Sequence, residues 1–195
     1  MRTGLVRPED APIRTVSSRE VYRNNWSRVR EDVIERRGGV RGLYGVMDKD
    51  PACILIPLEH TAQGEFITLV HQFRYTVQGS YFELPQGGWE DPDADVEEMA
   101  RGELREETGL RAGKITRIGQ NWIAYGAMRQ EHNVYLCEDL TQGEAELEPE
   151  EDGLTVHRVS VAEFERMILD GRVRDNCTLA AWGTYLVWKR AQAGG

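Results

Sequence analysis

Polar and apolar residues alternate along the first part of the chain with a period of two, which is typical of β-strands with one buried face. The alternation is clearest within residues 16–37, a Gly38-Gly39 pair supplies a turn, and the pattern returns over residues 41–47. We therefore expect a small antiparallel sheet ahead of the rest of the fold, preceded by a loose polar arm over residues 1–15.

Longer apolar runs predict the strands of a second, larger sheet. Residues 52–58 form a continuous apolar run that is typical of a core strand, and Gly64 supplies a hairpin turn before the run over residues 66–73. Shorter strand patterns follow over residues 81–84, 115–122, 131–137 and 155–160. A loop through Tyr125-Gly126 joins the second and third of these shorter strands.

Helical periodicity marks three further segments. Asp95 is a candidate N-cap for the first helix, and Gly109 is placed to end it in the left-handed conformation. Residues 161–169, with Ser160 as N-cap, and residues 175–193 form the other two. Strands before and between helices indicate a mixed α/β (α+β) layering.

The first helix brings three glutamates, Glu103, Glu106 and Glu107, onto one face, because positions i, i+3 and i+4 are neighbours on a helix. At roughly 6 Å and an effective dielectric of about 20, each pair of like charges costs about 3 kcal/mol. A divalent cation such as Mg²⁺ or Mn²⁺, which prefers carboxylate oxygens, would offset that repulsion. A solvated acidic face is the alternative. The absence of interleaved lysines and the Gly-Gly loop before the helix favour the metal site.

The segment that carries these glutamates resembles the Nudix box, whose pattern is G-x5-E-x7-R-E-U-x-E-E-x-G-U, with U an aliphatic residue. The matching positions are Gly88, Glu103, Leu104, Glu106, Glu107, Gly109 and Leu110. The metal-binding half of the box is therefore complete.

Two positions depart from the box. Ala94 stands where the pattern has Glu, and Gly102 stands where it has Arg. In the family that Arg steadies the glutamates by ion pairing, so Arg101 or Arg105 is a candidate replacement, although neither has the same helical angle. Gly102 also costs about 1 kcal/mol of helix propensity relative to Ala.

The resemblance extends upstream to residues 82–87, Phe-Glu-Leu-Pro-Gln-Gly, and to residues 70–75. These segments are similar to the ADP-ribose pyrophosphatase-like, or nucleoside diphosphate sugar hydrolase, group of the Nudix family. The resemblance implies a mixed β-sheet between helices, with the Nudix catalytic domain in residues 46–195. It also implies that residues 1–45, the arm and small sheet, pack across a two-fold homodimer.

The resemblance assigns roles to the acidic residues. Glu103 and Glu107 are the expected main metal ligands, with Glu106 shared or one contact further out and the carbonyl of Gly87 as a further ligand. A glutamate on a distal loop completes the metal shell or acts as the base, and Glu106 and Glu107 are the other catalytic candidates. The loop candidates are Glu148, Glu150, Glu151 and Asp152, of which Glu150 or Glu151 is favoured; a merely solvated acidic loop is the alternative.

Three residues are candidates for substrate binding. Arg74 is placed to contact a phosphate, with a surface ion pair as the alternative. Glu83 is placed to bind a nucleoside or ribose hydroxyl, with an edge-strand salt bridge as the alternative. Tyr125 aligns where the ADP-ribose group tends to have Pro, and a tyrosine in that region is associated with dinucleoside polyphosphate hydrolases.

The expected reaction is Mg²⁺-dependent hydrolysis of the pyrophosphate in a nucleoside diphosphate linked to another moiety, with ADP-ribose or a nucleotide sugar first. The products would be a nucleoside monophosphate and a sugar phosphate. Dinucleoside polyphosphates are the second hypothesis. A weakly catalytic Nudix domain used for binding or regulation, prompted by Ala94 and Gly102, is the third.

Composition narrows the choice of partners. The net charge of -9 argues against nucleic-acid or anionic-membrane binding, whereas it allows a small phosphorylated ligand whose charge a metal offsets. The three cysteines, Cys53, Cys137 and Cys177, are scattered and form no CxxC motif, so neither a zinc site nor a disulfide framework is expected. The sequence shows no signal-peptide pattern, and a cytoplasmic location is expected.

Overall fold

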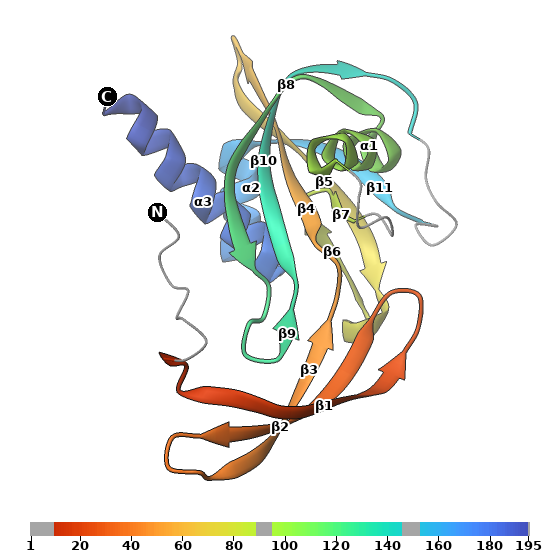
Figure 1. Cartoon of the computed structure of the whole chain (residues 1–195). Helices are drawn as coiled ribbons and strands as arrows, with labels where there is room; N and C mark the ends of the chain where they lie inside the picture. The colour runs from red at the N-terminus through yellow and green to blue at the C-terminus, as the bar shows by residue number, and fades with distance from the viewer. Residues whose placement is uncertain (1–9, 89–94, 146–152, 195) are drawn as a thin grey trace. The chain divides into compact units, whose positions relative to one another are not determined.

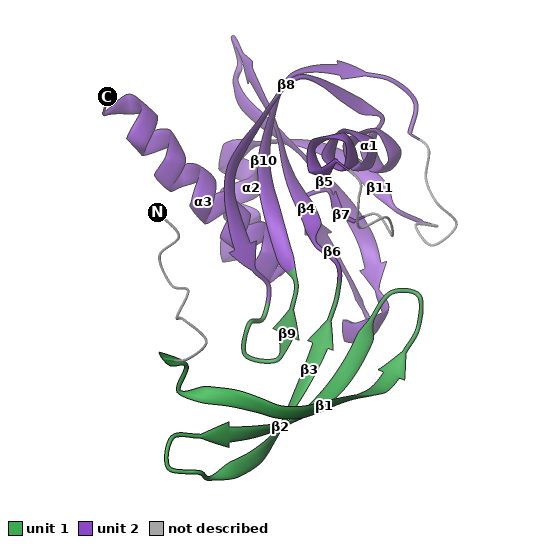
Figure 2. Cartoon of the chain, viewed as in Figure 1, with its two compact units in different colours: residues 1–49, 124–130 green, residues 50–123, 131–195 purple. Residues whose placement is uncertain are grey.

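The computed structural model describes residues 10–88, 95–145 and 153–194, and the chain divides into two compact units (Figure 2). Unit 1 comprises residues 1–49 and 124–130, and unit 2 comprises residues 50–123 and 131–195. No helix among the described residues is long and apolar enough to cross a membrane.

Unit 1 is a four-stranded sheet (Figure 1). Its strands, in the spatial order β1-β2-β3-β9, are β1 Ile13–Arg23, β2 Arg28–Arg36, β3 Arg41–Asp48 and β9 Met128–Arg129. The first three are antiparallel, as the alternating pattern predicts, and the turn between β2 and β3 contains Gly38 and Gly39, both with positive φ.

The fourth strand of unit 1 comes from far along the chain. β9 pairs parallel to β3 at Met47 and Asp48. Around this pairing, the Met47 amide donates to the Ala127 carbonyl at 3.0 Å, and the Tyr44 hydroxyl donates to the Gly126 carbonyl at 2.9 Å. The loop that contains Tyr125 is therefore part of the N-terminal unit.

Unit 2 contains a seven-stranded mixed sheet. Five of its strands follow the order β11-β5-β4-β10-β8, and the other two, β6 and β7, pair with β5 and β4. Only β4 and β10 are parallel; the other pairs are antiparallel. The bounds are β4 Ala52–Thr61, β5 Gly64–Arg74, β6 Gly79–Glu83, β7 Gln86–Gly87, β8 Leu110–Trp122, β10 Glu131–Gln142 and β11 Thr155–Ser160, with a 3₁₀ turn, η2 Tyr75–Val77, before β6.

Helices cover both faces of this sheet (Figure 1). On β4, Cys53 and Leu55 pack in a cluster with residues of α1 Val96–Thr108, while Ile54 and Ile56 pack in a second cluster with α2 Val161–Leu169 and α3 Asn176–Ala193. Successive residues of a strand point to opposite faces, so the two clusters lie on opposite sides of the sheet. The expected mixed sheet between helices is confirmed.

The ends of α1 follow local capping rules. The Asp95 carboxylate accepts from the amides of Glu97 at 2.8 Å and Glu98 at 3.1 Å. At the other end Gly109 has φ 72°, and its amide donates to the Arg105 carbonyl at 2.8 Å. Both caps confirm the sequence-based expectation and fix the length of the helix that carries the glutamates.

Replacing Gly109 should destabilise the protein, because a Cβ there would be strained at positive φ and would lie 2.7 Å from the Gly143 carbonyl oxygen. We expect Gly109→Ala to lower the free energy of unfolding by about 1–3 kcal/mol in urea denaturation. Gly183→Ala, in α3 with open space around it, is the control and should raise stability by up to about 1 kcal/mol. Equal effects of the two changes would contradict this account of the cap.

Candidate functional site

The candidate site forms where α1 packs against the short strand β7. Gly87 pairs with Cys53 of β4, which fixes the strand below the helix. A Cβ added at Gly87 would lie 2.5 Å from Cδ and 2.6 Å from Oε1 of Glu103. A side chain at position 87 would displace the Glu103 carboxylate, so glycine lets this carboxylate approach the backbone of β7.

Glu107 approaches the same strand one helical turn later. The backbone amide of Gln86 donates to Oε2 of Glu107 at 3.1 Å. Glu107 is 3% exposed and Glu103 is 9% exposed, so both carboxylates are buried at this contact. Their mutual repulsion is large in such surroundings, which favours a bound cation.

The third glutamate is held differently. The Glu106 carboxylate forms an ion pair with Arg105 at 2.7 Å. Arg101 instead pairs with Glu97 at 2.9 Å and donates to the Ala112 carbonyl. Of the two candidates to replace the arginine missing at Gly102, Arg105 is therefore the one that binds a box glutamate.

The donor set suits a hard divalent cation. The Glu103 and Glu107 carboxylates and the backbone of Gly87 lie at one junction of helix and strand, and oxygen donors of this kind are the ligands that Mg²⁺ and Mn²⁺ prefer. Within the described ranges, no three His, Cys, Asp or Glu side chains are grouped closely enough to form a complete site. The Glu106 carboxylate is engaged in its ion pair with Arg105.

Arg74 and Glu83 are brought together by the pairing of β5 with β6. The Arg74 Nε and Nη2 atoms donate to the two Glu83 oxygens, both at 2.9 Å. Burial opposes the charge on Arg74, but the hydrogen bond to Glu83, with the charges of Glu83, Glu107 and Asp175, outweighs it and raises the Arg74 pKa. The two expected substrate residues thus bind each other, as the ion-pair alternatives allowed.

A glutamine and an aspartate that sequence reasoning did not single out complete this network. The Gln86 side-chain amide donates to Glu83 Oε2 at 2.8 Å and to Asp175 Oδ2 at 3.0 Å. The same Asp175 oxygen caps α3 by accepting from the Thr178 amide at 2.8 Å. Asp175 could be found from sequence only as a helix start, since its contact with Gln86 depends on the tertiary fold.

Other expected site residues belong to the other unit or lie outside the described residues. Tyr125 is 84% exposed and belongs to unit 1, whereas the box glutamates belong to unit 2. The loop candidates Glu148, Glu150, Glu151 and Asp152 lie outside the described residues.

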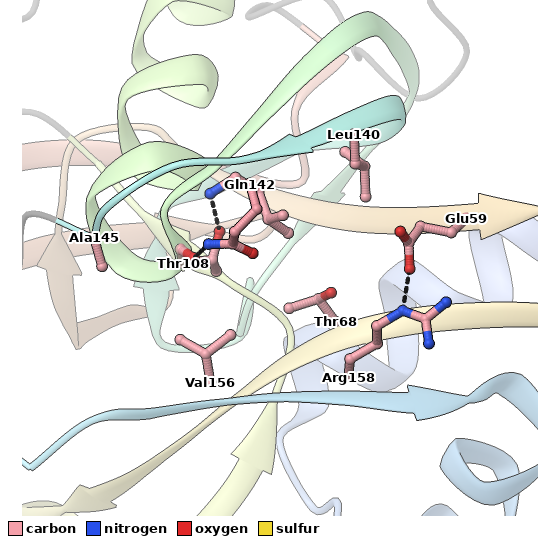
Figure 3. Close-up of a pocket in the computed structure, with 9 residues that line it drawn as sticks. Glu59, Thr68, Thr108, Leu140, Gln142, Ala145, Val156 and Arg158 are labelled. Atoms are coloured by element: carbon pink, nitrogen blue, oxygen red, sulfur yellow. Dashed lines mark hydrogen bonds and ion pairs between the residues drawn. The ribbon is translucent and has the colours of Figure 1, made fainter.

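A pocket of about 420 Å³ lies beside the C-terminal end of α1 (Figure 3). Several of its polar side chains have partners within the protein. Gln142 donates to the carbonyls of Thr108 at 3.2 Å and Gly143 at 2.9 Å, and Arg158 pairs with Glu59. Gln142 therefore helps to hold the end of α1. These contacts give no reason to place the reaction in this pocket.

The cysteines are unsuited to act as nucleophiles. Burial raises the pKa of Cys137 and of Cys177 to about 12, and burial together with the charge of Glu103 raises the pKa of Cys53 as well. A thiol with a raised pKa is protonated at neutral pH and reacts slowly. The groups suited to catalysis at this site are therefore the carboxylates of α1 and the backbone oxygens of β7.

The Arg74–Glu83 pair should be important for stability, because Glu83 is 2% exposed. We expect Arg74→Ala to lower the free energy of unfolding by about 3–5 kcal/mol in urea denaturation, since it leaves a buried carboxylate without its charge partner. Arg14→Ala, in the exposed pair with Glu35, is the control and should cost less than about 1 kcal/mol. A similar small loss for both variants would show that the buried pair has no special role.

Comparison with known proteins places this site in a family. The profile of the NUDIX domain matches residues 49–180, and that of the nucleoside diphosphate sugar hydrolase N-terminal domain matches residues 13–47. A crystal structure of an ADP compounds hydrolase superimposes with a TM-score of 0.78 at 20% identity, covering 93% of this chain and 96% of that one, which shows a shared fold.

Two curated relatives agree with these matches. An ADP-ribose pyrophosphatase of Bacillus subtilis is 31% identical over 134 residues, covering 68% of this chain and 71% of its own. An ADP-ribose pyrophosphatase of Mycobacterium tuberculosis is 26% identical over 167 residues, covering 85% and 79%. With the glutamates of α1 set against β7 in the expected fold, the chain belongs to the Nudix family of pyrophosphohydrolases.

Proposed function

We propose that the protein hydrolyses the pyrophosphate bond of a nucleoside diphosphate linked to another moiety, with ADP-ribose or a nucleotide sugar as the favoured substrate. The products are a nucleoside monophosphate and a sugar phosphate. The observation that supports this most directly is the burial of Glu103 and Glu107 against β7 in a chain similar to two ADP-ribose pyrophosphatases.

The chemistry requires charge neutralisation, because anionic phosphate oxygens repel a nucleophile. Glu103, Glu106 and Glu107, with the carbonyl of Gly87, are the residues that would hold Mg²⁺ or Mn²⁺. The ion would neutralise phosphate charge and acidify a water molecule. The buried setting of Glu103 and Glu107 strengthens their attraction for a cation, since few water molecules screen it.

The base is proposed to come from the acidic segment, with Glu150 or Glu151 favoured. The residues that flank this segment are well fixed. On one side, the Gly143 amide donates to the Gly109 carbonyl at 2.8 Å, at the end of α1. On the other, Thr155 pairs with His71 of β5. The two attachments lie on the helix and the strand that carry the proposed metal and substrate residues.

Arg74 is proposed to contact a phosphate. Its side chain is 42% exposed although Nε and Nη2 bind Glu83, so part of the guanidinium remains accessible. Glu83 is nearly buried, and we propose two roles for it. It orients Arg74, and it binds a ribose hydroxyl of the substrate. Tyr125 favours the alternative of a dinucleoside polyphosphate substrate. Its side chain is exposed and does not belong to the hydrophobic core.

Assembly as a homodimer is also proposed. β1 is the edge strand of unit 1, and all eleven of its residues are exposed in the single chain, including Val16, Val21 and Tyr22. An exposed apolar edge strand tends to associate with another chain. A second copy of the same chain would bury this strand and Leu43, which is also exposed.

The reaction is tested with a panel of ADP-ribose, nucleotide sugars and dinucleoside polyphosphates in the presence of Mg²⁺. We expect Glu107→Gln to lower kcat on the preferred substrate by about three orders of magnitude, which is about 4 kcal/mol, because the neutral amide is a poor ligand for Mg²⁺. Glu97→Gln, on the same helix but exposed and paired with Arg101, is the control and should remain near wild-type activity.

The outcomes of the panel separate the hypotheses. Preference for dinucleoside polyphosphates would replace the favoured substrate with the alternative. No turnover of any nucleoside diphosphate derivative would refute the enzyme proposal and leave a weakly catalytic domain that binds or regulates. A mild effect of Glu107→Gln would place the metal site elsewhere.

Light scattering tests the assembly. We expect a mass near twice the 22.2 kDa of one chain. Val21→Lys, which places a charge on β1, should shift the mass to that of one chain, whereas Val187→Lys, at an exposed apolar position of α3, should leave it unchanged. A wild-type mass near one chain would contradict the dimer.

A further inference from the structure

We propose that Gln86 and Asp175 act together as positioning residues for the metal-binding face of α1, an inference whose catalytic part rests on the proposed function. Neither residue is a candidate ligand. They act through β7, the two-residue strand that contacts both Glu103 and Glu107.

β7 has little support from the sheet itself. It pairs with β4 only at Cys53–Gly87 and Ile54–Gln86, and the preceding Pro85 carbonyl accepts from the Leu55 amide at 2.9 Å. So short a ladder leaves the strand dependent on side-chain contacts. The side chain of Gln86 supplies two of them, to Glu83 and to Asp175.

Gln86 binds three carboxylates at once. Its backbone amide donates to Glu107 at 3.1 Å, and its side-chain amide donates to Glu83 at 2.8 Å and to Asp175 at 3.0 Å. A primary amide has two N–H groups, so both are used, one for each carboxylate. The neutral amide thereby bridges two anions that would otherwise repel each other.

Asp175 extends this bridge to the opposite layer of the fold. Its Oδ2 accepts from the amide and the hydroxyl of Thr178, both at 2.8 Å, at the start of α3. The Thr178 hydroxyl accepts from the Leu84 amide at 2.9 Å. The segment from Leu84 to Gln86 is thus fixed to α3 on one side of the sheet while it binds α1 on the other.

Outer contacts of this kind control how well a metal is held. Residues that orient ligands commonly change metal affinity or activity by 10- to 100-fold when they are replaced. Removing the Gln86 side chain leaves its backbone amide in place but frees the strand that positions it. The Glu107 carboxylate and the Gly87 backbone should then lose their fixed relation, which weakens metal binding.

The test is direct binding of Mn²⁺, followed by electron paramagnetic resonance without substrate. Gln86→Ala should weaken Mn²⁺ binding about tenfold. Asp175→Ser should act in the same direction, because serine keeps the helix cap but is too short to reach Gln86. The double variant should be within about twofold of Gln86→Ala, since Gln86→Ala already removes the contact with Gln86 that Asp175→Ser removes. Gln120→Ala, which removes an exposed glutamine bonded to Glu131, is the control and should bind as wild type.

Kinetics supply a second measurement on the holoenzyme. The Mg²⁺ concentration for half-maximal activity should rise about tenfold in Gln86→Ala, and kcat at saturating Mg²⁺ should return towards wild type. A general loss of structure would lower kcat at every Mg²⁺ concentration. If circular dichroism shows Gln86→Ala to be unfolded, Asp175→Ser gives the same test with its cap intact.

The inference is overturned if Gln86→Ala and Asp175→Ser bind Mn²⁺ within twofold of wild type, as Gln120→Ala should. This result is distinguishable from failure of the proposed function. If wild type hydrolyses no nucleoside diphosphate derivative, the proposed function fails, yet the comparison of Mn²⁺ affinities still decides the role of Gln86 and Asp175.

Discussion

The site depends on the concentration of negative charge around a strand of only two residues. Glu103 and Glu107 reach β7 from α1, and Glu83 lies just before it at the end of β6. Buried carboxylates are stable only when charge or hydrogen bonding compensates them. Arg74 compensates Glu83 with a guanidinium, and Gln86 donates neutral N–H groups to Glu107, Glu83 and Asp175. A divalent cation at the box face would add to this compensation, because carboxylate oxygens are the ligands it prefers.

The strand β4 turns this local arrangement into a rigid one. Its alternate residues are buried on both faces, Cys53 and Leu55 against the α1 layer and Ile54 and Ile56 against α2 and α3. A strand packed on both sides has little freedom to move. β7 pairs directly with β4, so the backbone next to the glutamates is held by a core strand rather than by a surface loop.

Structural features that depend on neighbouring residues could be predicted from the sequence. The helix, its caps at Asp95 and Gly109, and the shared face of the box glutamates follow from spacings within a few residues. The strand patterns indicated a mixed α/β layering, and the family resemblance implied the mixed sheet between helices. The pairing of Arg74 with Glu83 required the register of β5 with β6. The contact of Gln86 with Asp175 joins residues 89 positions apart, and no periodic pattern encodes such a contact.

The position of β9 in the sequence limits how the N-terminal strands could be exchanged between related proteins. The N-terminal sheet takes its fourth strand from the connection between β8 and β10, so Met128 and Arg129 complete its hydrogen-bond ladder. Fusion of β1, β2 and β3 to another Nudix scaffold at one junction would leave β3 without its partner strand β9. Any exchange between paralogues, natural or engineered, would have to transfer residues 124–130 together with β1, β2 and β3.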